Sequence, residues 1–235
     1  MVESSSPTNY LIRGPKDNGN SVELWSTVRL PFELKGWLLE MRNSLKLAIR
    51  DIQGDNNTIL NAIYNSNQCE SVDVENVLIY DVGTAAFRHL CNKGLRFERR
   101  IASPPEISIK FNEPAMNYHY YGVVNREVPS LYWKKEVTLA HWKDISCPPI
   151  KGENKPHFFW YAVKKGSIEV TNEHPIPLEY GIRVIIKSPI RTEFNPVSVI
   201  KPLLDGIISS FHMHDGTDIL EIMKRLSKKV TESQR

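Results

Sequence analysis

An apolar stripe over residues 200–211 restricts the fold of this chain more than any other feature. Bulky apolar side chains recur there at steps of three and four residues, which is the period of one buried helix face. The stripe comprises Ile200, Leu203, Leu204, Ile207, Ile208 and Phe211. Pro202 has no backbone donor and belongs in a first turn. We therefore expect the helix to begin at Ser198, or at Asn195 with a later kink. Gly206 costs up to about 1 kcal/mol relative to alanine, and it either admits a neighbouring backbone or is simply tolerated.

Periodicity elsewhere predicts both strands and helices. Alternating or continuous apolar runs indicate strands over residues 22–30, 77–82, 95–102 and 180–187. Helical spacing and capping residues indicate helices over residues 34–52, 58–64, 84–90 and 218–230. The segment 107–161 is rich in aromatic residues and proline, which is typical of short strands joined by long loops. We expect an α+β fold, in which a mixed or antiparallel sheet packs with a long helix in the N-terminal half and two C-terminal helices.

The composition is that of an ordinary globular protein. The 235 residues are 41% hydrophobic and 24% charged, and no apolar run reaches the roughly 18 residues of a membrane-spanning helix. Residues 1–20 are polar, so we expect a disordered tail followed by a single domain over 21–235, with a subdivision near 103–106 as the alternative. The three cysteines are far apart, which excludes a disulfide framework, and the N-terminus lacks a basic and apolar leader. Together these features predict a cytoplasmic protein with no membrane partner.

Ionisable side chains on the second face of the C-terminal helix form a candidate catalytic group. Lys201 and Asp205 are one helical turn apart, His212 lies two turns beyond Asp205 on the same face, and His214 follows just beyond. A carboxylate neighbour could hold a histidine as a general base near neutral pH. The His-x-His spacing also occurs in metal sites, so a divalent metal is one candidate cofactor. The competing interpretation is a structural ion pair on the polar face that every amphipathic helix has.

Two clusters of basic residues are candidates for contacts with nucleic acid. Around Gly94 they are Arg96, Arg99 and Arg100, and on the last helix they are Lys224, Arg225, Lys228 and Lys229. Lysine and arginine bind phosphates, and the aromatic side chains of the middle segment could stack on bases. The net charge of only +3 does not itself argue for nucleic acid. The competing interpretations are solvated helix faces and aromatic residues that fill a sheet core.

The start of the C-terminal helix resembles a segment of the RusA-type Holliday junction resolvases. The matching positions are Lys201, Pro202, Leu204 and Asp205. At the positions of that family's acidic pair this chain has Asn195 and Val197, and at the amide position it has Ser198. The resemblance therefore implies a relative whose nuclease activity is altered or lost.

These observations predict a cytosolic protein associated with nucleic acid, from a DNA-processing or defence system. The first alternative is an enzyme that uses the histidine and aspartate group of the C-terminal helix, either as a metal-dependent hydrolase or as an acid–base hydrolase. The second alternative is a protein-interaction subunit of a larger complex. No nucleotide-binding glycine motif is present in the sequence. Substrate and oligomeric state stay open at this point.

Overall fold

The computed structural model divides the chain into two compact units. It describes residues 8–31, 33–68, 72–91, 94–128, 137–147, 155–171, 182, 184–186, 197, 199–211 and 219–232. Unit 1 comprises Met1–Val128 and Asn195–Val197, and unit 2 comprises Pro129–Phe194 and Ser198–Arg235. The boundary between these units falls after residue 128, and a subdivision near 103–106 stays a prediction. That the units form a single domain stays a prediction.

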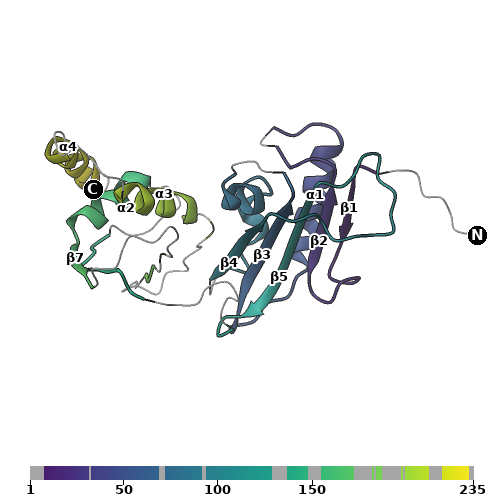
Figure 1. Ribbon diagram of the computed structural model, residues 1–235, viewed down its shortest axis with the longest axis horizontal. Coiled ribbons are helices and arrows are strands. Elements are labelled where there is room, and N and C mark those ends of the chain that lie inside the picture. The colour runs from purple at the N-terminus through teal and green to yellow at the C-terminus, as the bar shows by residue number, and fades with distance from the viewer. Residues whose placement is uncertain are drawn as a thin grey trace, which may run out of the picture. The chain divides into compact units, whose positions relative to one another are not determined.

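Unit 1 is built on a five-stranded sheet (Figure 1). Its strands are β1 (Tyr10–Arg13), β2 (Val22–Ser26), β3 (Thr58–Ser66), β4 (Leu95–Arg100) and β5 (Asn117–Asn125). They lie in the order β1-β2-β5-β3-β4. Only β3 and β4 pair in parallel, and the other neighbours are antiparallel. The sheet is therefore mixed, and with the helices described below the fold is α+β, as the sequence predicts.

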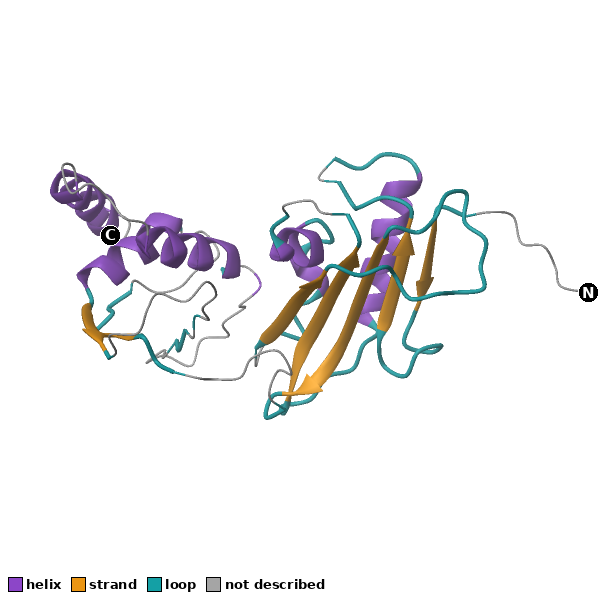
Figure 2. Cartoon of the chain, viewed as in Figure 1, coloured by secondary structure: helices purple, strands orange, loops and turns teal. Residues whose placement is uncertain are grey.

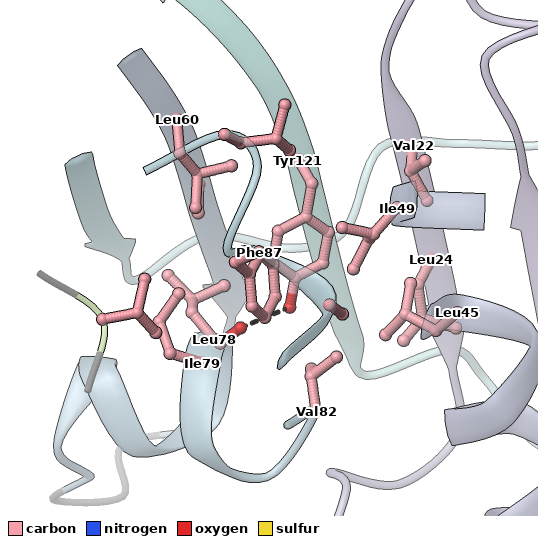
Figure 3. Packing of buried hydrophobic residues seen from close by; sticks show 14 of the residues in the cluster. Val22, Leu24, Leu45, Ile49, Leu60, Leu78, Ile79, Val82, Phe87 and Tyr121 are labelled. Carbon is pink, nitrogen blue, oxygen red and sulfur yellow. Dashed lines mark hydrogen bonds between the residues drawn. The ribbon is translucent and has the colours of Figure 1, made fainter. Parts of the chain in front are cut away.

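Helix α1 (Trp37–Arg50) covers one face of this sheet and confirms the long helix expected over residues 34–52. Its Met41, Leu45 and Ile49 are fully buried, at the three- and four-residue spacing of one helix face. Every second residue of the strands points to this face, and Val22, Leu24, Leu60 and Tyr121 meet the helix in one apolar core (Figure 3).

Three elements of unit 1 differ from the sequence prediction. Residues 58–64 were expected to be helical but lie in β3, which pairs with β4 on one side and β5 on the other. Residues 77–82 were expected to be a strand, but Asn76–Tyr80 forms a π-helical turn, η1. Residues 84–90 shorten to a 3-10 turn, η2 (Thr84–Ala86). A short, fully buried apolar run satisfies helix and strand equally well, so periodicity alone does not distinguish them.

Part of the expected tail belongs to the sheet. Residues 10–13 form β1, which pairs with β2 along its whole length. The predictions of strands over 22–30 and 95–102 are confirmed by β2 and β4, which both end earlier than expected.

The segment 101–116 crosses the face of the sheet opposite α1 (Figure 2). The Trp25 indole donates a hydrogen bond of 3.0 Å to the Pro105 carbonyl, and Thr8 forms a bridge with Phe111. Trp25 and Tyr118 are buried side by side on this face, with ring centroids 5.0 Å apart. These two rings therefore pack within the protein and are not accessible to bases.

A buried polar group lies on the opposite face, where α1 packs. His119 is fully buried, and its Nδ1 lies 3.0 Å from the Tyr121 hydroxyl. That hydroxyl donates its one hydrogen to the Leu78 carbonyl at 3.0 Å (Figure 3). The hydroxyl must therefore accept from Nδ1–H, which leaves the neutral Nε2 as an acceptor. Nε2 is buried, and no residue in the described part of the chain hydrogen-bonds to it.

Unit 2 contains the two-stranded antiparallel sheet of β6 (Ala140–Lys143) and β7 (Ser167–Val170). Its described helices are α2 (Pro156–Lys165), α3 (Ile200–Phe211) and α4 (Ile219–Glu232). The last two confirm the expected C-terminal helices. The sequence places Phe158–Tyr161 in a segment of short strands, but these residues lie in α2, which begins at a proline, as first helical turns often do.

Helix α3 packs on α2 through a face that is rotated from the one expected. Leu203, Gly206, Ile207 and Ser210 are buried, whereas Ile208 is 43% exposed. A Cβ on Gly206 would lie 2.3 Å from the Pro156 carbonyl oxygen and 2.7 Å from Phe159 Cβ. The glycine therefore admits a neighbouring backbone, and this contact turns the buried face of α3 toward it.

Some expectations fall on residues that the structure does not describe. The helix starts proposed at Asn195 and Ser198 are among them, as is most of the strand expected over 180–187. Of that range only Ile182 and residues 184–186 are described, and none of these is in a strand. Among the described helices, none is long and apolar enough to cross a membrane.

Candidate anion-binding site

Helix α1 carries a row of three basic side chains along one side. Arg42, Lys46 and Arg50 follow one another at steps of four residues, so each lies about 6 Å above the last. Each comes directly after one of the buried residues Met41, Leu45 and Ile49. The row therefore runs along the edge of the buried face, where Arg42 and Lys46 are half-buried and Arg50 is exposed. We call these three residues the α1 basic row.

The middle of the row lies against the turn that follows η1. A Cβ on Gly83 would lie 2.8 Å from Lys46 Cε and 3.1 Å from Lys46 Nζ. The backbone at Gly83 has a φ of +117°, which side-chain-bearing residues rarely adopt. Glycine thus meets two requirements at this position: it permits the turn, and it leaves room for the lysine amine beside the backbone.

Among the residues that the structure describes, Arg42 and Lys46 of the α1 basic row have like charges as neighbours and no carboxylate within ion-pair distance. Partial burial lowers the pKa of Lys46, and the positive charges of Arg42 and Arg50 lower it further. Arg42 Nε is buried and has no hydrogen-bond partner among the described residues. Within the described part of the chain, neither Arg42 nor Lys46 forms an ion pair. Adjacent like charges destabilise a helix slightly, so this row is better suited to holding an anion than to stabilising the fold.

The structure divides the basic cluster predicted on β4. Alternation along the strand places Arg96 and Arg100 on one face and Arg99 on the other. Arg100 pairs with Glu98 at 2.6 Å. Arg96 donates a hydrogen bond of 2.6 Å to the Val128 carbonyl, and Arg99 donates one of 3.3 Å to the Gln68 carbonyl. All three guanidinium groups are thus engaged within the protein, and their contact with nucleic acid stays a prediction.

The basic cluster predicted near the C-terminus lies on α4. Lys224 and Arg225 are exposed, and Arg225 forms an ion pair with Glu221 one turn earlier. The side chains of Lys228 and Lys229 lie outside the described residues. This cluster also stays a prediction.

Two residues of the candidate catalytic group, Lys201 and Asp205, are among the described residues. Lys201 Nζ and Asp205 Oδ2 on α3 lie 3.9 Å apart, and their side chains are 30% and 44% exposed. A pair this exposed contributes little to stability. His212 and His214 lie outside the described residues, so their approach to Asp205 stays a prediction. Among the described residues, no group of three or more histidines, cysteines and acidic residues could hold a metal ion.

The α1 basic row was not predicted from the sequence, although its spacing is visible there. Basic residues at positions 42, 46 and 50 form an i, i+4, i+8 series beside the apolar stripe of the same helix. On its own, such a series is typical of a solvated face. What distinguishes it is the contact between Lys46 and Gly83, which depends on a tertiary packing that no local pattern encodes.

The functional proposal for this chain rests on the geometry of the α1 basic row. No protein-family model, curated protein or solved structure matches the chain.

Proposed function

We propose that this protein is a cytosolic nucleic-acid-binding protein and that the α1 basic row contacts the phosphate backbone. The observation that carries the proposal is the alignment of Arg42, Lys46 and Arg50, with no carboxylate partner for Arg42 or Lys46 in the described part of the chain. A role in DNA processing or defence is part of the same proposal.

The shape of the row favours a chain of phosphates over a single small ion. Three cations at steps of about 6 Å span about 12 Å along the helix, which is longer than one phosphate group. Arginine can bind a phosphate with two parallel hydrogen bonds, and lysine adds a compact point charge. Contacts of this kind position a protein on nucleic acid but carry no sequence information. We therefore expect binding that is strongly salt-dependent and similar for all sequences.

The test is the salt dependence of binding to a fluorescent DNA duplex, followed by anisotropy. In the double variant Arg42→Gln/Arg50→Gln, the slope of log K against log salt should flatten by about 0.9 for each lost contact. A single-stranded oligonucleotide should show about 0.7 for each contact. The matched control is Lys16→Gln/Lys110→Gln, which removes the same charge from two exposed positions of unit 1 and should leave the slope nearly unchanged.

Two outcomes would contradict the proposal. One is that the parent protein does not bind DNA or RNA at low salt. The other is that the control variant loses as much slope as the Arg42→Gln/Arg50→Gln variant, because binding would then reflect only net charge. Matching far-ultraviolet circular dichroism spectra would show that all variants are folded.

The same assay tests the clusters predicted from the sequence. Arg225→Gln removes a charge on α4 that is already paired with Glu221, and Arg100→Gln removes one that is paired with Glu98. We expect each to change the slope less than either substitution in the α1 basic row.

A further inference from the structure

Lys46 has a defined position in the fold and two features that make a lysine amine reactive. Its Nζ is close to the Gly83 backbone, and it is half-buried, so that it is partly desolvated and still accessible. Arg42 and Arg50 carry positive charge one turn away on either side. In unit 1 the other described lysines, Lys16, Lys35 and Lys110, are all exposed.

We propose that Lys46 is a modification site that is acylated by anionic acyl donors of the acyl phosphate class, and that acylation weakens phosphate binding by the α1 basic row. The effect on phosphate binding rests on the proposed function, whereas the acylation of Lys46 does not.

The chemistry requires only the free amine and the donor. The lone pair of Lys46 Nζ attacks the acyl carbon and forms a C–N bond. The C–O bond to the phosphate breaks, and the phosphate leaves with the bonding electron pair. The amine loses one proton to water or to the departing phosphate. The products are an amide on Lys46 and inorganic phosphate, so no oxidant, reductant or metal is needed.

The neighbours of Lys46 promote this reaction in two ways. The guanidinium groups of Arg42 and Arg50 attract the phosphate of the donor, which raises its local concentration beside the amine. Burial and the same two charges lower the pKa of Lys46, so a larger fraction of the amine is unprotonated near neutral pH. Geometry and charge therefore act in the same direction at this lysine.

Acylation would also change the site itself. The amide is neutral, so the α1 basic row would retain two of its three charges, and the acyl group would occupy the space beside Gly83. A protein that binds phosphates through this row would then bind them less tightly and with a smaller salt slope.

The experiment is to incubate the full chain with acetyl phosphate and to measure the acetylation rate of each lysine by peptide mass spectrometry. Lys46 should react about tenfold or more faster than Lys16, Lys35 and Lys110. In Arg42→Gln/Arg50→Gln this preference should fall severalfold. The conservative Arg42→Lys/Arg50→Lys variant keeps both charges and should retain most of the preference.

A neutral donor, the N-hydroxysuccinimide ester of acetic acid, separates the two effects. With this donor the preference for Lys46 should be smaller, because only the reactivity of the amine contributes. Equal rates at all four lysines with acetyl phosphate would overturn the proposal. So would a preference that is undiminished in a folded Arg42→Gln/Arg50→Gln variant. Labelling needs no nucleic acid, so preferential acetylation in a protein that binds no DNA or RNA would refute the proposed function and leave the acylation site standing.

Discussion

At the scale of single residues, His119 shows how the fold fixes a protonation state. Its Nδ1–H donates to the Tyr121 hydroxyl, while its Nε2 is buried without a hydrogen-bond partner in the part of the chain that the structure describes. Burial lowers the pKa of His119 to about 3. The imidazolium form would be a buried charge that no described carboxylate contacts, so the folded protein holds this side chain neutral at neutral pH.

We therefore expect His119 to make stability depend on pH in the acid range. In the unfolded chain it takes up a proton as pH falls below about 6.5, but in the folded protein it does not do so until about pH 3. Between these values the unfolded state binds more protons. The free energy of unfolding should therefore fall with decreasing pH, by up to about 1.4 kcal/mol per pH unit from this group.

The variant His119→Phe isolates this contribution. Urea unfolding at pH 7 and at pH 4.5 should show a smaller loss of stability in the variant than in the parent protein. The Tyr121 hydroxyl can still donate to the Leu78 carbonyl in the variant, so this buried hydroxyl keeps its acceptor. The same loss in both proteins would mean that other groups cause the acid sensitivity.

At the scale of elements, the contact between α2 and α3 depends on one missing side chain. Alanine at position 206 would improve helix propensity by about 1 kcal/mol. Its Cβ, however, would come within 2.3 Å of the Pro156 carbonyl oxygen, which is backbone and cannot turn away. The two helices would have to separate, and Leu203 and Ile207 would lose part of their packing.

Gly206→Ala should therefore destabilise unit 2, by a net amount of about 1–3 kcal/mol. The matched control is Ser209→Ala on the exposed side of the same helix, which should be neutral or slightly stabilising. Thermal unfolding measured by circular dichroism compares the two variants. A Gly206→Ala protein that is more stable than the parent would show that α2 and α3 do not approach so closely.

Elements with a clear period could be predicted from the sequence, and elements defined by their neighbours could not. α1, β2 and β4 were expected because apolar residues of their sequences recur at the spacing of a helix face or on alternate strand positions. β3 was missed because Ile59, Leu60 and Ile63 also suit helical spacing. It forms a strand because it pairs with β4 on one side and β5 on the other, and both partners are distant in sequence.

The candidate site was missed for a related reason. The site depends on the η1 turn and on Gly83, which has a positive φ and follows that turn. In η1 three consecutive apolar residues, Val77, Leu78 and Ile79, are all buried. No surface face is left in such a run to define a period. The basic residues of α1 were visible in the sequence, but the turn that makes Lys46 distinctive was not.

At the scale of the whole molecule, the chain returns to unit 1 after forming part of unit 2. Val197 is fully buried in the core of unit 1, and its carbonyl accepts a hydrogen bond of 3.2 Å from the Tyr80 hydroxyl. Val199, two residues later, is also buried but belongs to unit 2. Each unit therefore contains segments that are distant in the sequence.

Val197→Ala should destabilise unit 1, although the position lies far from the rest of that unit in the sequence. The loss should be about 1–2 kcal/mol, at about 0.8 kcal/mol for each buried CH₂. Hydrogen exchange followed by mass spectrometry should show faster exchange in α1 and β3. Val199→Ala is the control and should leave those elements unchanged. Faster exchange only in α2 and α3 of the Val197→Ala variant would contradict the assignment of Val197 to unit 1.

The place of Val197 also bears on the order of events during synthesis. The ribosome finishes Val128, the last residue of the main segment of unit 1, well before it reaches Val197. At about 5–20 residues per second, the intervening chain takes several seconds to make. During that interval the nascent sheet and α1 would lack the Val197 side chain, and the Val197 carbonyl that accepts from the Tyr80 hydroxyl would not yet be present. Newly made chains would thus pass through a stage in which the α1 basic row has been synthesised but the core of unit 1 is still incomplete.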